Sequence, residues 1–300
     1  MKFTFNVIRH SRLWLAISGA IVVAAFLALF TYGLNFGIDF TGGSLLQVNA
    51  PATSVEALRN VVATTGFEPV VQQGEGDSYF VRLAPVTEEQ HQAILTAVKS
   101  ISPDATEVRF DTVGPAIGGE LKTASLKATA LMLLLITLYV AWAFRKVTRP
   151  VASWKYGVVT MISAFHDVII PLGVFAVLGH YLGYQVDMAF VAAVLTILGY
   201  SINDTIVVLD RTRENLMRHR HGDISFGDIV NKSVLETIAR SMNTTFSTML
   251  PLLAVFVVGG ETTRPFVLAL LIGMLSGAYS SIFVASPLLV EWEKWRAHRA

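Results

Sequence analysis

Six long runs of apolar residues dominate the pattern along the chain. They cover residues 13–32, 128–144, 156–180, 188–209, 241–258 and 265–290. About 20 apolar residues in a helix span the roughly 30 Å hydrocarbon core of a bilayer, so each run is long enough, or nearly so, to cross it. The pattern therefore predicts an integral membrane protein, mainly α-helical, with six transmembrane helices.

Residues 33–123 follow a different pattern, that of a small folded domain. Strands are expected at 44–49, 68–73, 78–83 and 106–113, with helices at 53–65 and 87–101. Each helix opens with a capping box, Thr53-x-x-Glu56 or Thr87-x-x-Gln90, in which side chains and backbone satisfy each other's amides. The order β-α-β-β-α-β is that of the ferredoxin-like split unit. We expect a ferredoxin-like α+β domain between the first two transmembrane helices.

This domain carries no recognisable catalytic group. His91 is its only histidine and falls on a predicted helix surface, where a solvated side chain is expected. The glycine-rich segments 37–43 and 114–119 lack the Gly-Lys-Ser/Thr that completes a phosphate loop. We interpret them as flexible elbows at the two ends of the domain.

Basic residues collect on one side of the predicted topology. They occur in the N-terminal segment, in the stretches 145–155 and 211–240, and in the tail, whereas the loop 181–187 has none and 259–264 has only Arg264. Because cytoplasmic loops are enriched in Lys and Arg, both termini are predicted to be cytoplasmic and residues 33–123 extracytoplasmic. The domains are then 1–32 with the first helix, 33–123 outside, and 124–300 with helices two to six.

Composition narrows the chemistry further. The chain has no cysteine, which excludes disulfides and cysteine metal sites. No metal or cofactor motif and no nucleic-acid-binding module is present in the sequence. The basic stretch 211–221 could attract anionic lipid head groups, although its role as a topology signal is a sufficient explanation.

Ionisable residues inside the apolar runs are the candidate functional groups. Each costs roughly 2.5–3.5 kcal/mol at a helix centre, so such residues usually have a role. His166 and Asp167 lie near the middle of the third run, Asn203 and Asp204 lie in the fourth, and Arg240 is predicted to open the fifth helix. Asp204 and Arg240 can approach each other, either as a functional pair or as a static ion pair. His166 and Asp167 could form a proton relay or a structural pair.

Spacing places further polar and small residues on helix faces. Thr196, Tyr200, Asn203 and Asp204 share one face of helix four, and a similar stripe on helix five contains Arg240, Asn243, Thr244, Ser247, Thr248 and Pro251. Both stripes are expected to face the bundle interior. Small residues recur at every fourth position of helix six, at Gly273, Gly277, Ser281 and Ala285, which favours close helix packing.

Four segments together resemble a known family. They are Gly37-Ile38-Asp39-Phe40-Thr41-Gly42-Gly43, Val113-Gly114-Pro115-Ala116-Ile117-Gly118, Ala164-x-His166-Asp167-Val168 and a long stretch of helix four that contains Asn203-Asp204 and ends in Asp210-Arg211-x-Arg213-Glu214-Asn215. Their order and topological positions resemble the SecF family of bacterial protein-export proteins, within the resistance-nodulation-division superfamily. The resemblance covers nearly the whole chain.

The resemblance implies a function that composition cannot supply. Members of this family associate with SecD, assist the SecYEG channel, and use the proton-motive force to help export an unfolded preprotein across the bacterial inner membrane. Asp204 and Arg240 match the family's proton-pathway residues, with Asn203, Asp167 and His166 as further candidates. A further aspartate would come from SecD. The chain would then be a transport component and not an enzyme, with either protons or sodium ions as the coupling ion.

Two other classes of function were weighed. An exporter of a small hydrophobic compound, as found elsewhere in the superfamily, would need outer modules larger than 33–123. An intramembrane protease could pair Asp167 with Asp204, but the sequence lacks Gly-x-Gly-Asp, His-Glu-x-x-His and Gly-x-Ser-Gly. The sequence therefore favours protein export.

Overall fold

The computed structural model describes residues 6–145, 151–219 and 224–297. Lys2, Lys146, Arg149, Arg220 and Arg299, which contribute to the predicted charge asymmetry, lie outside these residues. The chain forms two compact units. Unit 1 consists of Met1–Leu34, Ala128–Tyr181 and Ala189–Ala300, and unit 2 of Asn35–Lys127 and Leu182–Met188.

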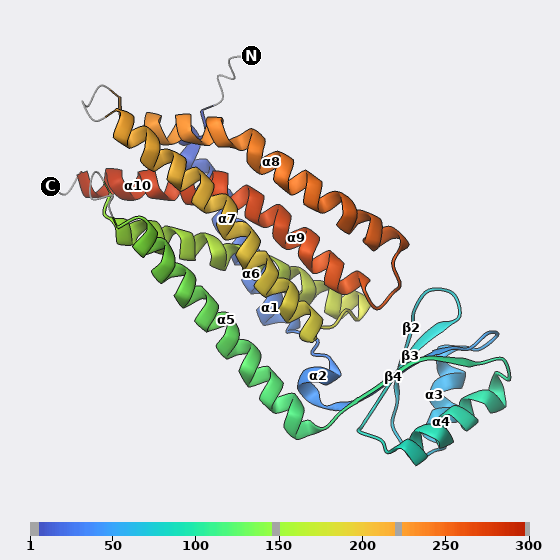
Figure 1. The fold of residues 1–300 in the computed structure, drawn as a ribbon. Coiled ribbons are helices and arrows are strands. Elements are labelled where there is room, and N and C mark those ends of the chain that lie inside the picture. Colours follow the sequence, from blue (N-terminus) through green and yellow to red (C-terminus); the bar gives the residue numbers. More distant parts are fainter. Residues whose placement is uncertain (1–5, 146–150, 220–223, 298–300) are drawn as a thin grey trace. The chain divides into compact units, whose positions relative to one another are not determined.

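Long helices make up unit 1 (Figure 1). They are α1 (Ser11–Tyr32), most of α5 (Pro115–Ala143), α6 (Ser153–Leu182), α7 (Met188–Arg218) and α8 (Phe226–Val258). The last helix is built from α9 (Arg264–Ser280), the π-helical turn η2 (Ser281–Ala285) and α10 (Ser286–Ala297). The short 3-10 helix η1 (Ile8–His10) precedes α1. Within the described residues, six helices are long and apolar enough to cross a membrane. The predicted mainly helical chain with six such helices is confirmed.

Several helices extend well beyond their apolar runs. Helix α8 begins at Phe226, where the Ser225 hydroxyl accepts a hydrogen bond from Asp228 N. Arg240 therefore lies inside this helix, and the prediction that it opens helix five is wrong. Hydropathy detects only the apolar part of a helix, whereas polar helix formers continue the backbone hydrogen bonds past it.

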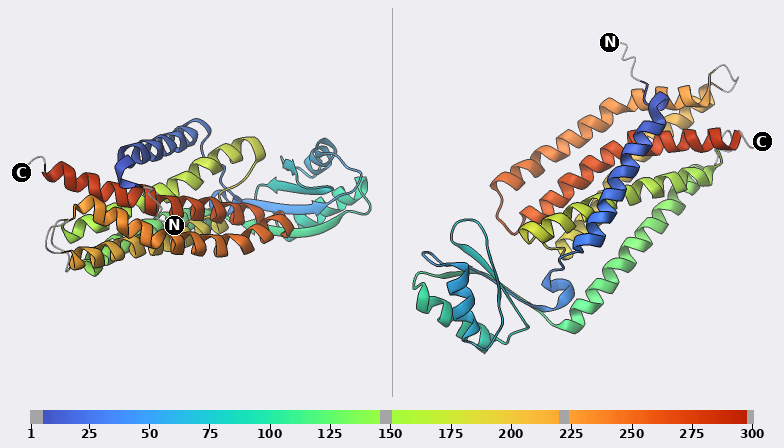
Figure 2. Two further views of the ribbon diagram at one scale, coloured as in Figure 1. Left: turned by 90° about the horizontal axis from the view of Figure 1, so that it is seen from above. Right: turned by 180° about the vertical axis from the view of Figure 1, so that it is seen from behind.

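The small residues of the last helix pack against α7. A Cβ on Gly273 would lie 2.2 Å from Ile197 Cδ1, and one on Gly277 would lie 2.8 Å from Ser201 Cβ. The Ser281 hydroxyl is 2.9 Å from that of Thr205. The predicted packing role of this face is confirmed, and its partner is within the chain. On the other side, α9 runs alongside α8, as the two views in Figure 2 show.

Unit 2 is a four-stranded antiparallel sheet with two helices on one face (Figure 1). Its elements are α2 (Ile38–Thr41), β1 (Gly43–Asn49), α3 (Val55–Ala63), β2 (Val70–Gln73), β3 (Ser78–Leu83), α4 (Glu88–Ile101) and β4 (Thr106–Val113), with the strands in the order β2-β3-β1-β4. The predicted alternation of strands and helices is observed. Leu46, Val81, Leu58 and Ile94 are among the buried side chains that join the sheet to α3 and α4.

One of the two predicted capping boxes is present. The Thr87 hydroxyl accepts from Gln90 N, and the Gln90 side chain accepts from Thr87 N at 2.8 Å. Helix α3 is instead capped by Ser54, whose hydroxyl accepts from Ala57 N at 3.2 Å. The Thr53 hydroxyl donates to Pro51 O, so its capping box is wrong by one residue.

His91 is buried, and the prediction of a solvated side chain is wrong. Its ring stacks on Phe110 with centroids 3.8 Å apart, and only 4% of the residue is exposed. Glu88 and Glu107 lie 3.3 and 3.4 Å from its two ring nitrogens. Hydrogen bonds from Gln92 and then from His91 hold the pKa of Glu88 below its ordinary value. The histidine is thus part of the packed interior of unit 2.

Candidate functional site

Asp167 in α6 is enclosed by hydroxyl groups. It is 0% exposed. Ser201 of α7 donates to its Oδ2 at 2.5 Å, and Ser280 of α9 donates to the same oxygen at 2.6 Å. Ser276 donates to Oδ1 at 2.9 Å, and His166 Nδ1 lies 2.9 Å from that oxygen. Four donors from three helices therefore surround one carboxylate, which is a fully satisfied buried site.

His166 and Asp167 were predicted from the sequence as candidate residues, but the serines around them were not. Ser201 is one residue from Tyr200 on α7, yet it lies on a different face of the helix. Ser276 and Ser280 are four residues apart, and they share one face of α9. That four-residue spacing could have indicated a polar face on this helix. Which helix the two serines contact, however, depends on how α6, α7 and α9 are rotated about their own axes.

The environment of Asp204 contrasts with that of Asp167. Asp204 follows Ser201 by three residues on α7, which is about one helical turn. The residue is 4% exposed, and its Oδ2 is buried without a hydrogen-bond partner in the described part of the chain. Ser241 of α8 lies beside the carboxyl group, but the geometry does not make a hydrogen bond, and its hydroxyl is also buried and unpartnered. Arg240 is exposed, and no ion pair between it and Asp204 occurs among the described residues. Asp204 is thus a buried carboxylate whose hydrogen bonds are incomplete.

The polar stripes of α7 and α8 face the bundle interior only in part: Asp204 is buried, and the half-buried Tyr200 donates to the Thr245 hydroxyl at 3.4 Å. Asn203, Arg240, Asn243 and Ser247 are exposed, as is Thr196. The side chains turned inward on α8 are a different set with four-residue spacing, namely Ser233, Thr237, Ser241 and Thr245. The exposed members of the predicted stripes therefore lie at an open face of unit 1, while Asp204 is buried.

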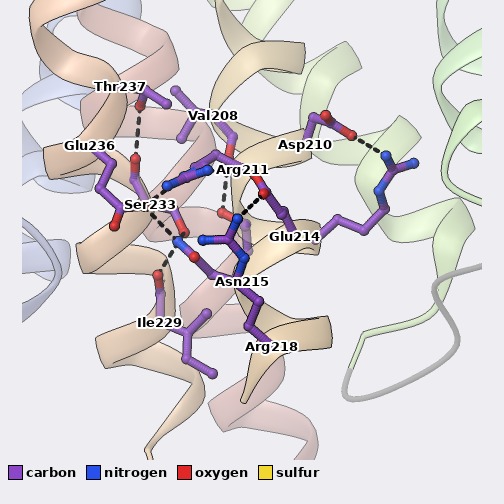
Figure 3. Close-up of polar contacts among 12 residues, drawn as sticks. Val208, Asp210, Arg211, Glu214, Asn215, Arg218, Ile229, Ser233, Glu236 and Thr237 are labelled. Atoms are coloured by element: carbon purple, nitrogen blue, oxygen red, sulfur yellow. Dashed lines mark hydrogen bonds and ion pairs between the residues drawn. The ribbon is translucent and has the colours of Figure 1, made fainter. Parts of the chain in front are cut away.

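A network of charged and amide groups joins the C-terminal end of α7 to the N-terminal part of α8 (Figure 3). Arg211 bridges two carboxylates, donating to Glu236 at 2.6 Å and to Glu214 at 2.5 Å. Asn215 donates to Glu236 at 2.9 Å and to the Ser233 hydroxyl at 3.0 Å. The basic stretch considered above as a topology signal thus also holds the two helices together at the end opposite Met188.

The donor sets of these sites do not indicate a metal centre. No cluster of three or more His, Cys, Asp or Glu side chains suited to a metal ion occurs among the residues that the structure describes. Buried carboxylates in membrane helices instead mark ion pathways in pumps and transporters. The fold and these sites define a multi-pass membrane protein of the transport type.

Comparison with known proteins identifies the family. Residues 93–295 match the model of the protein-export membrane protein SecD/SecF C-terminal region, and residues 27–50 match the SecD/SecF GG motif. The protein translocase subunit SecF of Thermobaculum terrenum is 40% identical, with 96% of this chain and 94% of that protein covered. The SecF subunit of Anaerolinea thermophila is 35% identical, with coverages of 97% and 96%. The chain belongs to the SecD/SecF family of protein-export membrane proteins.

Relatives with a longer chain show the same architecture. The crystal structure of SecDF from Thermus thermophilus, a translocon-associated membrane protein, aligns with a TM-score of 0.85 at 37% identity. The alignment covers 97% of this chain and 39% of that one. The chain thus spans about two fifths of the length of that SecDF protein.

Proposed function

We propose that this chain uses the proton-motive force, together with SecD, to promote the export of preproteins through the SecYEG channel. Family membership and the similarity to SecDF, in which both parts are fused, support the pairing. In this proposal the termini are cytoplasmic and residues 33–123 are extracytoplasmic. The β-α-β-β-α-β order and the strand order β2-β3-β1-β4 support a ferredoxin-like fold for the outer domain, which would contribute to handling of the preprotein.

The observation that carries the proposal is the incomplete hydrogen bonding of Asp204. A carboxylate held by several donors has no reason to accept a proton, whereas a buried carboxylate without them is readily protonated. An approaching guanidinium reverses this preference, because an opposite charge favours the ionised form. Asp204 is therefore the group that exchanges the proton, and Arg240 tunes the exchange.

The energies involved are of matching size. One elementary charge that crosses the membrane potential releases about 2.3 kcal/mol per 100 mV. A change of one pKa unit corresponds to about 1.4 kcal/mol. The energy released by one proton is therefore of the size needed to change the protonation of one buried carboxylate.

The open polar face supports a partner next to Asp204. Polar side chains at membrane depth are costly in contact with lipid and usually line a protein interface or a cavity. Asn203, Arg240 and Asn243 are exposed on this face. Because this chain corresponds to only 39% of the fused relative, we infer that SecD covers the face and contributes a further aspartate to the pathway.

Translocation of a preprotein into membrane vesicles, with and without a proton gradient, tests the proposal. Asp204→Asn and Arg240→Met should each abolish the gradient-dependent stimulation while the protein remains inserted and co-purifies with SecD. Asp204→Glu should retain part of the stimulation because a titrating group survives. Glu293→Gln, which neutralises a carboxylate on α10, is the matched control and should export normally.

A static ion pair makes the opposite prediction. Each single neutral variant would then lose assembly because it leaves an unpaired buried charge, and the double variant would recover assembly and export together. Export at the wild-type rate by the double variant under a gradient would show that these residues have no coupling role.

A further inference from the structure

The glycine-rich motif in unit 2 is a packed junction and not the flexible elbow predicted. A Cβ on Gly42 would lie 2.8 Å from Pro115 Cα, and one on Gly118 would lie 2.9 Å from Gly42 N. A Cβ on Gly37 would lie 3.2 Å from Asp187 Cβ. Gly42 also has a φ of +71°, which L side chains rarely adopt. The backbones around Gly42 and Gly118 therefore meet at distances that only glycine allows, and Gly37 lies close to the segment that holds Asp187.

Backbone hydrogen bonds join this motif to the segment that leads into α7. Gly37 N donates to Val186 O at 2.9 Å, and Val186 N donates to Asn35 O at 2.8 Å. Phe36 and Val186 form a parallel β-bridge. The segment Leu182–Met188 is thus part of the same junction as the motif.

Asp39 makes the contact that reaches α7 itself. Its Oδ2 accepts a hydrogen bond from Met188 N at 2.8 Å. Met188 is the first residue of α7, and the first amides of a helix have no partner within the helix. A carboxylate from a distant part of the sequence therefore acts as the N-terminal cap of this helix, where a negative charge also interacts favourably with the helix dipole.

The sheet of unit 2 holds the same segment from a second direction. Gln72 of β2 donates to Leu182 O at 2.7 Å. Arg82 of β3 donates to Gln72 Oε1 at 3.0 Å, and its Nε and Nη1 lie 3.0 and 3.1 Å from the amide oxygen of Gln185 in the orientation that satisfies both groups. Burial lowers the pKa of Arg82 from its ordinary value, which is expected for a guanidinium enclosed in such a contact.

We propose that Asp39 is a positioning residue that couples the sheet-bearing outer unit to helix α7. A displacement of the sheet is passed through the Leu182–Met188 segment, and Asp39 keeps the first turn of α7 attached to the junction during that displacement. Because α7 continues without a break from Met188 to Asp204, a pull at its capped end shifts the carboxylate that the proposed function assigns to proton exchange. This inference rests on that proposed function.

Hydrogen exchange and translocation, both measured on the complete complex with SecD, test the coupling. Asp39→Ala should speed exchange of the amides at residues 188–191 by about two- to thirtyfold, the range expected when a helix N-cap is lost. The same variant should lose most of the gradient-dependent stimulation, while gradient-independent translocation stays unchanged. Asp39→Asn keeps an acceptor oxygen at the same place and should restore both properties. Asp104→Ala, which removes an exposed carboxylate of unit 2, is the matched control.

A reciprocal variant removes the donor instead of the acceptor. Met188→Pro deletes the amide that Asp39 binds, while proline is well tolerated at the first position of a helix. It should reproduce the loss of stimulation, and adding Asp39→Ala to it should cause little further loss. If Asp39→Ala does not accumulate in the membrane, Met188→Pro alone tests whether the bond between Asp39 and the amide of residue 188 is needed for stimulation.

Three results would overturn the coupling. They are unchanged exchange at 188–191 in Asp39→Ala, faster exchange with full stimulation, or a loss in Asp39→Asn as large as in Asp39→Ala. Asp204→Asn is measured in parallel to separate the two proposals. If Asp204→Asn retains stimulation, the proposed function fails, whereas a loss there with full stimulation in Asp39→Ala overturns the coupling alone.

Discussion

Two aspartates in neighbouring helices of unit 1 have opposite surroundings. Asp167 is held by three serine hydroxyls and a histidine from three helices. Asp204 is almost as deeply buried but has an oxygen without a partner, next to a serine hydroxyl that also lacks one. Both are single carboxylates within apolar helices, so burial alone does not distinguish their roles.

The difference shows how the same residue type can be fully hydrogen-bonded at one site and incompletely hydrogen-bonded at another. The serine hydroxyls around Asp167 tie α7 and α9 to α6, so moving these helices apart would break several hydrogen bonds at once. The Oδ2 of Asp204 has no hydrogen bond in the described part of the chain, so it joins no second helix to α7. The hydrogen bonds of Asp167 hold α6, α7 and α9 together without any contribution from Asp204. Asp204 therefore remains available for contacts with a partner.

The largest effect is expected from Asp167→Ala. It removes the acceptor for three hydroxyls, at roughly 1 kcal/mol each, and should lower the free energy of unfolding by about 3 kcal/mol. Unfolding of the purified protein in detergent measures the loss. Asp167→Asn should fall between this variant and the wild type. If Asp167→Ala is as stable as the wild type, the serine contacts are not an anchor, and the comparison fails.

Gly277→Ala disturbs the hydrogen bonds of Asp167 through a change in helix packing. The new Cβ would lie 2.8 Å from Ser201 Cβ and displace that hydroxyl from Asp167. Overpacking of this kind costs about 1–3 kcal/mol. Gly199→Ala on α7 is the control, because its Cβ would meet only Met132 Cε at 3.9 Å. Equal stability of the two variants would show that the close approach of α9 to α7 does not support the site.

Glu236→Gln tests the charged network at the far ends of α7 and α8. Its bonds to Arg211 and Asn215 are partly exposed, and such pairs contribute less than about 1 kcal/mol. The loss should shrink further in high salt, because ions screen exposed charges. A larger, salt-independent loss would place this network with Asp167 as a structural anchor.

The smallest effect on stability is expected from Asp204→Asn. The buried Oδ2 has no hydrogen bond to lose, so the free energy of unfolding should stay within about 0.5 kcal/mol of the wild type. The same detergent unfolding measurement applies. A loss comparable to that of Asp167→Ala would mean that the two aspartates play the same structural part.

The membrane-spanning pattern and much of unit 2 were predictable because both depend on local periodicity. The strands Ser78–Leu83 and Thr106–Val113 end at the residues expected, and the Thr87 cap is present. Alternation of apolar residues and capping chemistry act within a few residues of sequence. Such features can be read without knowing how distant segments meet.

What the sequence could not supply depends on the rotation of one element against another. The burial of His91 requires Phe110 of another element beneath its ring. The role of Asp39 requires the amide of Met188, which is far away in the sequence. The start of α8 was misplaced for a simpler reason, because its first turns are polar and hydropathy does not register them.

The π-helical turn Ser281–Ala285 has a consequence for the last helix as a whole. Each residue of an α-helix advances the side-chain direction by about 100°, so a turn that holds one residue more changes which side chains lie in line before and after it. Before the turn, Gly273 and Gly277 are directed at α7, and beyond it α10 contacts α1. Deleting a single residue between 281 and 285 would leave both halves helical but rotate one against the other. One of these two neighbours would then meet the wrong side chains, so the length of this short stretch is as constrained as its composition.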